Sequence, residues 1–90
     1  MKEQIRAFVL HVVRDEMNLP INLAEVTDET PVGVGGLDLE SLGLAELAMH
    51  VEQEFDVKIR DEEFEWLATA SLGAVVDRLA AATPVGGATR

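Results

Sequence analysis

The chain has 90 residues, which allows one small domain and argues against a large enzyme with a deep pocket. It has no cysteine, which excludes disulfides, thiolate metal sites and a cysteine nucleophile, so any thiol chemistry must come from an attached group. The formal net charge is −10, and thirteen acidic but only two basic residues lie between positions 25 and 65, which argues against binding of nucleic acid or anionic lipid.

The first expected element is a helix near the N-terminus. Apolar residues recur there with helical spacing, at Ile5, Phe8, Val9, Val12 and Val13. The helix should end near residues 17–18, because Pro20 disfavours helical geometry at Leu19 and has no backbone N–H to donate. No apolar run has the length of a signal peptide or a membrane span, so we expect a soluble, cytoplasmic protein with no membrane partner.

Residues 18–40 are expected to form a long loop. They show no sustained periodicity and contain turn-forming or helix-breaking residues at Asp28, Pro31, Gly33, Gly35 and Gly36. Loops of this length in compact domains are usually either functional or disordered. Here we expect order, because enough apolar residues are present to hold the loop across the helices: Leu19, Ile21, Leu23, Val26, Val32 and Leu37.

A second amphipathic helix is predicted for residues 41–55. At about 100° per residue, one arc of this helix holds the apolar residues expected in the core: Leu44, Leu47, Ala48, Val51 and Phe55. The next helix should be short: the run Asp61-Glu62-Glu63 offers it a cap and an acidic first turn, and its apolar residues are Phe64 and Leu67. Trp66 could pack at its edge.

Thr69 is the expected N-cap of a last helix, in which apolar residues recur at Leu72, Val75, Val76 and Leu79. The following segment, residues 83–90, has two glycines, a proline and no periodicity, so a domain at 1–82 with a flexible C-terminal tail at 83–90 is expected. The predicted fold is therefore all-α: a four-helix bundle with a long loop between helices 1 and 2 and a short helix 3.

Ser41 lies where the glycine-bearing loop meets the second helix, and from local sequence alone the common role of such a serine is an N-cap. A serine hydrolase would need a Gly-x-Ser-x-Gly elbow and a nearby histidine, but residue 39 is leucine and His50 lies on about the opposite side of the helix. Residues 38–43 also begin like a calcium loop. Leu42 and Met49 then stand where oxygen ligands are needed, so no metal site is expected.

The triplet Glu40-Ser41-Leu42 is followed by a longer pattern, namely Glu46-Leu47, Met49, Glu52, Glu54-Phe55-Asp56, Ile59 and Asp61-Glu62-Glu63. Together, residues 38–67 resemble the acyl carrier protein family. In that family a serine between an acidic residue and a leucine carries a 4′-phosphopantetheine arm derived from coenzyme A, which implies that Ser41 is the attachment site. The chain departs from the family pattern by having Glu40 for the usual Asp, Gly43 where an acidic residue is common, and Arg60 where Pro is common.

The resemblance implies a free-standing, non-catalytic carrier that holds acyl or aminoacyl groups as thioesters and is expected to be monomeric. Its partners would be a phosphopantetheinyl transferase, an acyl- or aminoacyl-loading enzyme, and synthase or tailoring enzymes with basic docking patches. The Gly-Gly-Leu-Asp-Leu-Glu-Ser-Leu form resembles carriers of polyketide, nonribosomal peptide or related pathways more than fatty-acid synthesis carriers. The alternative from another class is an acidic interaction module without an arm, in which Ser41 is only a cap.

A second apolar strip on the helix at 41–55 is the expected docking face. Leu42, Ala45 and Met49 lie more than a quarter-turn from the core arc and should be exposed. Glu52 borders the strip on one side and Glu46 on the other, with Glu40 at its start. The apolar strip would supply contact, and the glutamates would steer basic partners toward Ser41.

Overall fold

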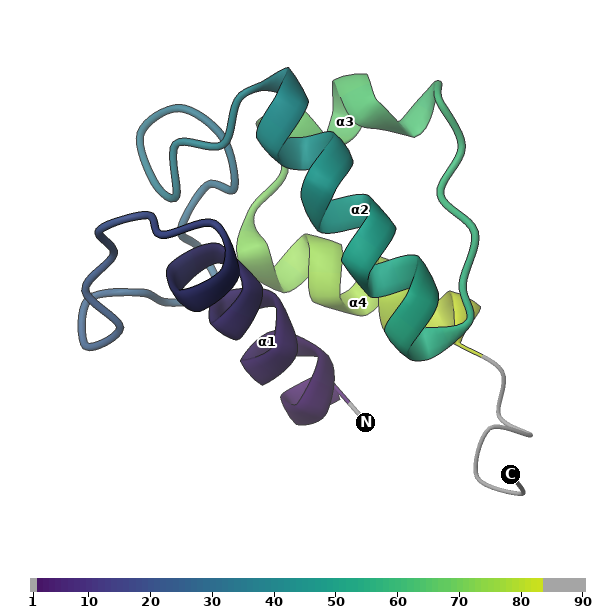
Figure 1. Ribbon diagram of the computed structural model, residues 1–90, viewed down its shortest axis with the longest axis horizontal. Coiled ribbons are helices and arrows are strands. Elements are labelled where there is room, and N and C mark those ends of the chain that lie inside the picture. Colours follow the sequence, from purple (N-terminus) through teal and green to yellow (C-terminus); the bar gives the residue numbers. More distant parts are fainter. Residues whose placement is uncertain (1, 84–90) are drawn as a thin grey trace.

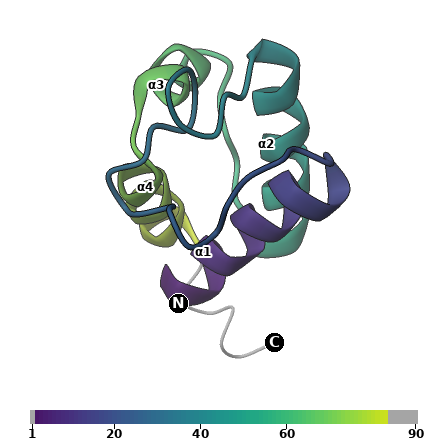
Figure 2. The same cartoon turned by 90° about the vertical axis from the view of Figure 1, so that its left-hand side faces the viewer.

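The computed structural model describes residues 2–83, which form helices joined by loops and contain no strand. The elements in chain order are α1 (Lys2–His11), the π-helix η1 (Val12–Glu16), α2 (Ser41–Phe55), α3 (Glu63–Thr69) and α4 (Leu72–Ala82). Helix α1 packs against α4 and α2, and α2 packs against α3 (Figure 1, Figure 2). The predicted all-α fold, with a long first connection and a short third helix, is confirmed. None of the described helices is long and apolar enough to cross a bilayer.

The first helix ends in a wider, π-helical turn. The Met17 N–H donates to the Val12 carbonyl at 2.8 Å, five residues back, and Asn18 then adopts a left-handed backbone with φ 58°. The helix therefore ends at the predicted position, although the sequence did not predict the π geometry. Its apolar stripe faces the core as expected, with Phe8 partly buried and the other members buried: Ile5, Val9, Val12 and Val13.

The long loop is ordered by backbone hydrogen bonds to the junction between α3 and α4. The Val32 N–H donates to the Ala70 carbonyl at 2.9 Å. The first N–H groups of α4 are also used, because Leu72 donates to the Thr30 carbonyl and Gly73 to the Asp28 carbonyl, both at 2.8 Å. These bonds tie the loop to the start of α4 and satisfy donors that a helix leaves free at its N-terminus.

Most of the apolar residues in the loop pack as predicted. Val32 and Leu37 are buried, while Leu19, Ile21 and Val26 are partly buried against the core. The expectation for Leu23 was wrong, since it remains 42% exposed. Leu39, which was not predicted to pack, is buried instead.

Helix α2 has the predicted bounds and the predicted core face. Leu44, Leu47, Ala48 and Val51 are buried. Phe55, at its last turn, is half-buried and packs edge-on against Phe8 of α1, with 5.3 Å between ring centroids. The helix ends at Asp56, whose left-handed backbone has φ 57°.

The expected cap of α4 was wrong, and the start of α3 has no capping side chain. Within the predicted run Asp61-Glu62-Glu63, Glu62 occupies the N-cap position of α3, but its side chain forms no capping bond. Helix α3 continues through Thr69, and the Ser71 hydroxyl accepts from the Ala74 N–H at 3.2 Å, which makes Ser71 the cap of α4. The loop carbonyls explain why α4 starts after Ser71 and not after Thr69, because they accept hydrogen bonds from the N–H groups that directly follow Ser71.

Helix α3 is anchored to α4 by a bidentate ion pair. The Glu63 carboxylate accepts from Arg78 Nε at 2.6 Å and from Arg78 Nη2 at 2.8 Å, and it also accepts from the Arg60 N–H at 2.9 Å. The Arg78 guanidinium and, after it, the Arg60 N–H lower the pKa of Glu63 to about 2. Arg78 also donates to the Lys58 carbonyl at 3.1 Å, so the pair holds the segment before α3 as well.

Helix α4 ends at a buried threonine. The Thr83 N–H and hydroxyl both donate to the Leu79 carbonyl, at 2.9 and 2.7 Å. The rest of the predicted flexible tail, residues 84–90, lies outside the described residues.

Candidate functional site

Ser41 is the exposed first residue of α2. The N-cap position belongs to Glu40, which has an extended backbone with φ −94° and ψ 179°. The Ser41 hydroxyl forms no hydrogen bond with any described residue. The second serine of the chain, Ser71, differs in this respect because its hydroxyl caps α4. Ser41 is therefore not the cap of α2.

The N-terminus of α2 is open, in contrast to that of α4. The N–H groups of Ser41, Leu42 and Gly43 find no acceptor among residues 2–83, and the first bond of the helix runs from the Leu44 N–H to the Glu40 carbonyl at 2.8 Å. Free N–H groups and the helix dipole make this end electropositive. A phosphate ester formed on Ser41 would lie beside these donors, an arrangement that helix N-termini favour.

A tight turn directs the chain into α2. The Asp38 N–H donates to the Gly33 carbonyl at 2.8 Å, and Asp38 Oδ1 accepts from the Gly35 N–H at 3.0 Å. Asp38 itself has a left-handed backbone with φ 60°, which an Asp tolerates better than most residues. The Leu39 N–H then donates to the Val32 carbonyl at 3.2 Å, so the approach to Ser41 is fixed two residues before the helix begins.

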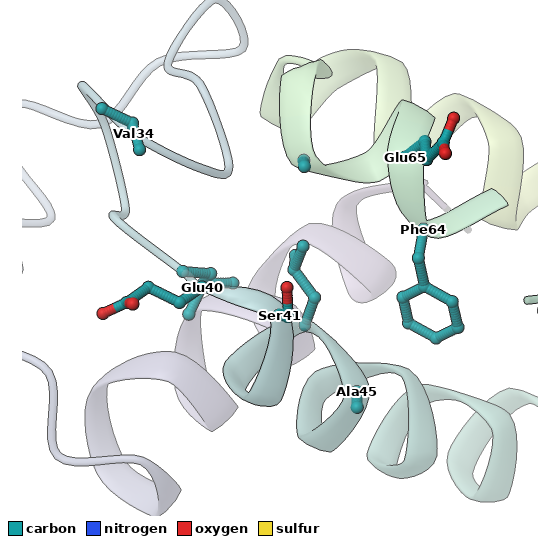
Figure 3. Close-up of a pocket in the computed structure, with 9 residues that line it drawn as sticks. Val34, Glu40, Ser41, Ala45, Phe64 and Glu65 are labelled. Atoms are coloured by element: carbon teal, nitrogen blue, oxygen red, sulfur yellow. The ribbon is translucent and has the colours of Figure 1, made fainter. Parts of the chain in front are cut away.

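A cleft of about 490 Å³ opens beside Ser41 between the loop, α2 and α3 (Figure 3). The Ser41 hydroxyl and the Phe64 ring lie at its border in this view. Most of the lining is apolar, and its charged residues are both acidic; the full set is Val34, Leu39, Glu40, Ser41, Leu44, Ala45, Phe64, Glu65 and Ala68. The hydroxyl thus adjoins an apolar hollow that has carboxylates and no cation in its lining.

The apolar strip on α2 is exposed, as its position on the helix predicted. Leu42 is 76% and Met49 is 52% exposed, and Ala45 and Glu46 are exposed as well. Glu52 differs, because it is half-buried and its carboxylate accepts from the Ile59 N–H at 2.8 Å. Glu52 therefore supports the segment that follows α2, in addition to bordering the strip.

The glycine at position 43 has a packing reason. A Cβ at this position would lie 3.1 Å from Met17 Cε and 3.4 Å from Leu39 Cδ2. The first contact is tighter than ordinary van der Waals packing and the second is at its lower limit, so Gly43 lets the end of the Met17 side chain approach the first turn of α2.

Sequence reasoning missed two features of the site, the turn at Asp38 and the position of Val34. Neither belongs to a periodic element, and the run Gly35-Gly36 indicated only a turn. Within residues 2–83, no group of three or more His, Asp or Glu side chains is arranged to hold a metal ion.

A four-helix fold with a free serine at the start of α2 is the arrangement expected of a phosphopantetheine carrier. A family model described as "Phosphopantetheine attachment site" matches residues 7–79, which is most of the chain. The chain therefore belongs to this family, whose members carry covalently attached 4′-phosphopantetheine. The match includes α2 and the cleft.

Proposed function

We propose that Ser41 carries the 4′-phosphopantetheine arm and that the thiol of the arm holds acyl or aminoacyl groups as thioesters. The observation that carries this proposal is the free hydroxyl of Ser41 at the open N-terminus of α2. The protein itself catalyses no reaction in this scheme. It presents the arm, and partner enzymes act on the attached group.

The attachment reaction places specific demands on the serine. Its oxygen attacks the phosphorus atom that bears the pantetheine part of coenzyme A, and the bridging P–O bond of the pyrophosphate breaks. Adenosine 3′,5′-bisphosphate leaves, and the serine proton passes to a base of the transferase. A buried or capping hydroxyl could not reach that phosphorus, whereas Ser41 is exposed and makes no hydrogen bond within residues 2–83.

The exposed strip of α2 is the proposed docking face for partner enzymes. Leu42, Ala45 and Met49 supply apolar contact beside Ser41, and the carboxylates that border them attract basic surfaces; these are Glu40, Glu46 and Glu52. Because Glu52 also accepts from a backbone N–H, its charge should be tested with Glu52→Gln, which keeps an acceptor at that position.

The attachment site is tested by intact mass after incubation with coenzyme A and a broad-specificity phosphopantetheinyl transferase. The wild-type chain should gain one phosphopantetheinyl group, and Ser41→Ala should gain none. Ser71→Ala is the matched control, since it removes the only other serine and should still be modified. Modification of Ser41→Ala, or none of the wild-type chain, would overturn the proposal.

For the pathway, we propose polyketide, nonribosomal peptide or related specialised biosynthesis, from the form of the segment around Ser41. Fatty-acid synthesis is the alternative within the family. Loading of the holo-protein by a fatty-acid malonyl transferase, as fast as that enzyme loads its own carrier, would favour the alternative.

A further inference from the structure

Val34 is an apolar side chain held in solvent next to Ser41. It is 87% exposed, more than any other large apolar residue among those described, and Leu42 follows at 76%. Val34 lines the same cleft as Ser41, and in Figure 3 it lies on the opposite side of the serine from Ala45. An apolar side chain this exposed buries almost no surface, so it contributes almost nothing to the stability of the fold.

The turn that carries Val34 is closely constrained. A Cβ at Gly33 would lie 2.3 Å from the Ala68 carbonyl oxygen, so only glycine allows the loop to contact α3 there. On the other side of Val34, the Gly35 N–H is bound by the Asp38 carboxylate at 3.0 Å. Val34 is thus held outward by a turn that is fixed on both sides.

The charges near Val34 indicate what kind of surface can cover it. Glu40 and Glu65 line the cleft, Asp38 is exposed in the turn, and no Lys, Arg or His lines the cleft. A protein that covers Val34 therefore needs an apolar contact surrounded by basic side chains. Coenzyme A is itself an anion, so these carboxylates repel it unless the enzyme that delivers it places cations between the two.

The need to reach the serine selects one partner. Enzymes that act on the end of the arm can dock up to an arm's length away from Ser41. A transferase must bring the coenzyme A pyrophosphate into bonding contact with the Ser41 oxygen, so its surface must cover the residues around that serine. We propose that Val34 is a contact residue for the phosphopantetheinyl transferase, on the loop side of Ser41. This inference rests on the proposed attachment at Ser41.

The test compares initial rates of phosphopantetheine transfer, with coenzyme A saturating and the carrier varied, for wild type, Val34→Ser, Val34→Ile and Leu23→Ser. Leu23→Ser is the matched control, because Leu23 is in the same loop, is 42% exposed and does not line the cleft. Val34→Ser should lower kcat/KM about five- to tenfold, an effect typical of a moderately important interface residue. Val34→Ile should retain the wild-type rate, and Leu23→Ser should change it less than about twofold. All variants should keep the wild-type melting temperature.

The possible failures are distinguishable. If wild type is modified at Ser41 and Val34→Ser is modified equally fast, the inference about Val34 is overturned while the attachment site stands. Equal loss of rate in Leu23→Ser would also overturn it, because the effect would not be specific to the cleft. A dimer seen by sedimentation in wild type and lost in Val34→Ser, with the transfer rate unchanged, would assign Val34 to contact with a second copy of the chain. If the wild-type chain gains no mass, the proposed function itself fails.

Discussion

The ion pair between α3 and α4 allows a quantitative test of what holds one wall of the cleft in place. Replacing Glu63 with glutamine keeps the size of the side chain but removes its charge and one of its two carboxylate oxygens. In the wild-type protein those oxygens accept from Arg78 at 2.6 and 2.8 Å and from the Arg60 N–H at 2.9 Å. The substitution should therefore loosen α3 without changing the apolar core.

The size of the effect follows from the pKa of Glu63. Its fall from 4.5 to about 2 corresponds to at most about 3.4 kcal/mol, at about 1.36 kcal/mol per unit. The side chains of Arg78 and Glu63 retain 28% and 22% exposure, so solvent screens part of this interaction. We expect Glu63→Gln to lower the free energy of unfolding by about 1–2 kcal/mol at neutral pH.

The pH dependence has a definite sign. Because folding lowers the pKa of Glu63, the ionised carboxylate favours the folded state, and this contribution is complete above pH 4.5 and is lost as the pH falls toward 2. Other carboxylates also titrate in this range, so the informative quantity is the difference between wild type and variant. The gap in unfolding free energy should be full at neutral pH and should close at the acid end.

Urea unfolding at stepped pH measures this gap. Glu65→Gln is the matched control, because Glu65 is an exposed carboxylate on the same helix with no ion pair among the described residues. The unfolding free energy of Glu65→Gln should stay within about 0.5 kcal/mol of that of wild type at every pH. A gap for Glu63→Gln that is missing at neutral pH, or that persists unchanged at the lowest pH, would refute this account of the pair.

Three further predictions concern α2. Leu47→Ala should lower the free energy of unfolding by about 2–5 kcal/mol in denaturant titrations, because Leu47 is buried; a loss below about 1 kcal/mol would contradict its core position. Met49→Glu should leave the melting temperature nearly unchanged but slow modification of Ser41. Glu46→Lys should slow modification most at low salt, since the Debye length is about 30 Å at 0.01 M and about 3 Å at 1 M. An effect of Glu46→Lys on the rate that does not depend on salt would exclude steering by Glu46. Conversion from apo to holo form should raise stability by about 0.3–1 kcal/mol, more at low salt, because a phosphodiester on Ser41 would lie at the open N-terminus of α2. Calorimetry of both forms checks this, and a lower melting temperature for the holo form would contradict it.

The sequence predicted the positions of the helices better than their capping residues. The bounds of α2 agree with the structure because a continuous periodic pattern starts after a glycine-rich loop and stops at Phe55. Thr69 and Ser71 are both good capping residues, so local preference could not choose between them. The choice depends on the carbonyls of Asp28 and Thr30, which approach from a distant part of the chain.

The parts of the site that lie on a regular helix were predictable, and those that lie in loops were not. The exposure of Leu42 and Met49 followed from their angle on a regular helix. The exposure of Val34 did not, because residues in a loop have no periodicity from which a buried or exposed side can be read. The second role of Glu52 could not be predicted either, since its acceptor bond depends on where the chain after α2 places Ile59.

The long loop meets the N-termini of both α2 and α4, and the two differ in whether their N–H groups and serine hydroxyls have partners. Val32, which is fully buried, donates its N–H to Ala70 beside α4 and accepts at its carbonyl from Leu39, two residues before Ser41. The two backbone hydrogen bonds of this one buried residue therefore link the start of α4 to the segment that leads into α2. At α4, the loop carbonyls and a serine hydroxyl satisfy the N-terminal donors. At α2, the donors and the serine hydroxyl remain without partners among the described residues, and this difference leaves them available to the phosphodiester proposed at Ser41.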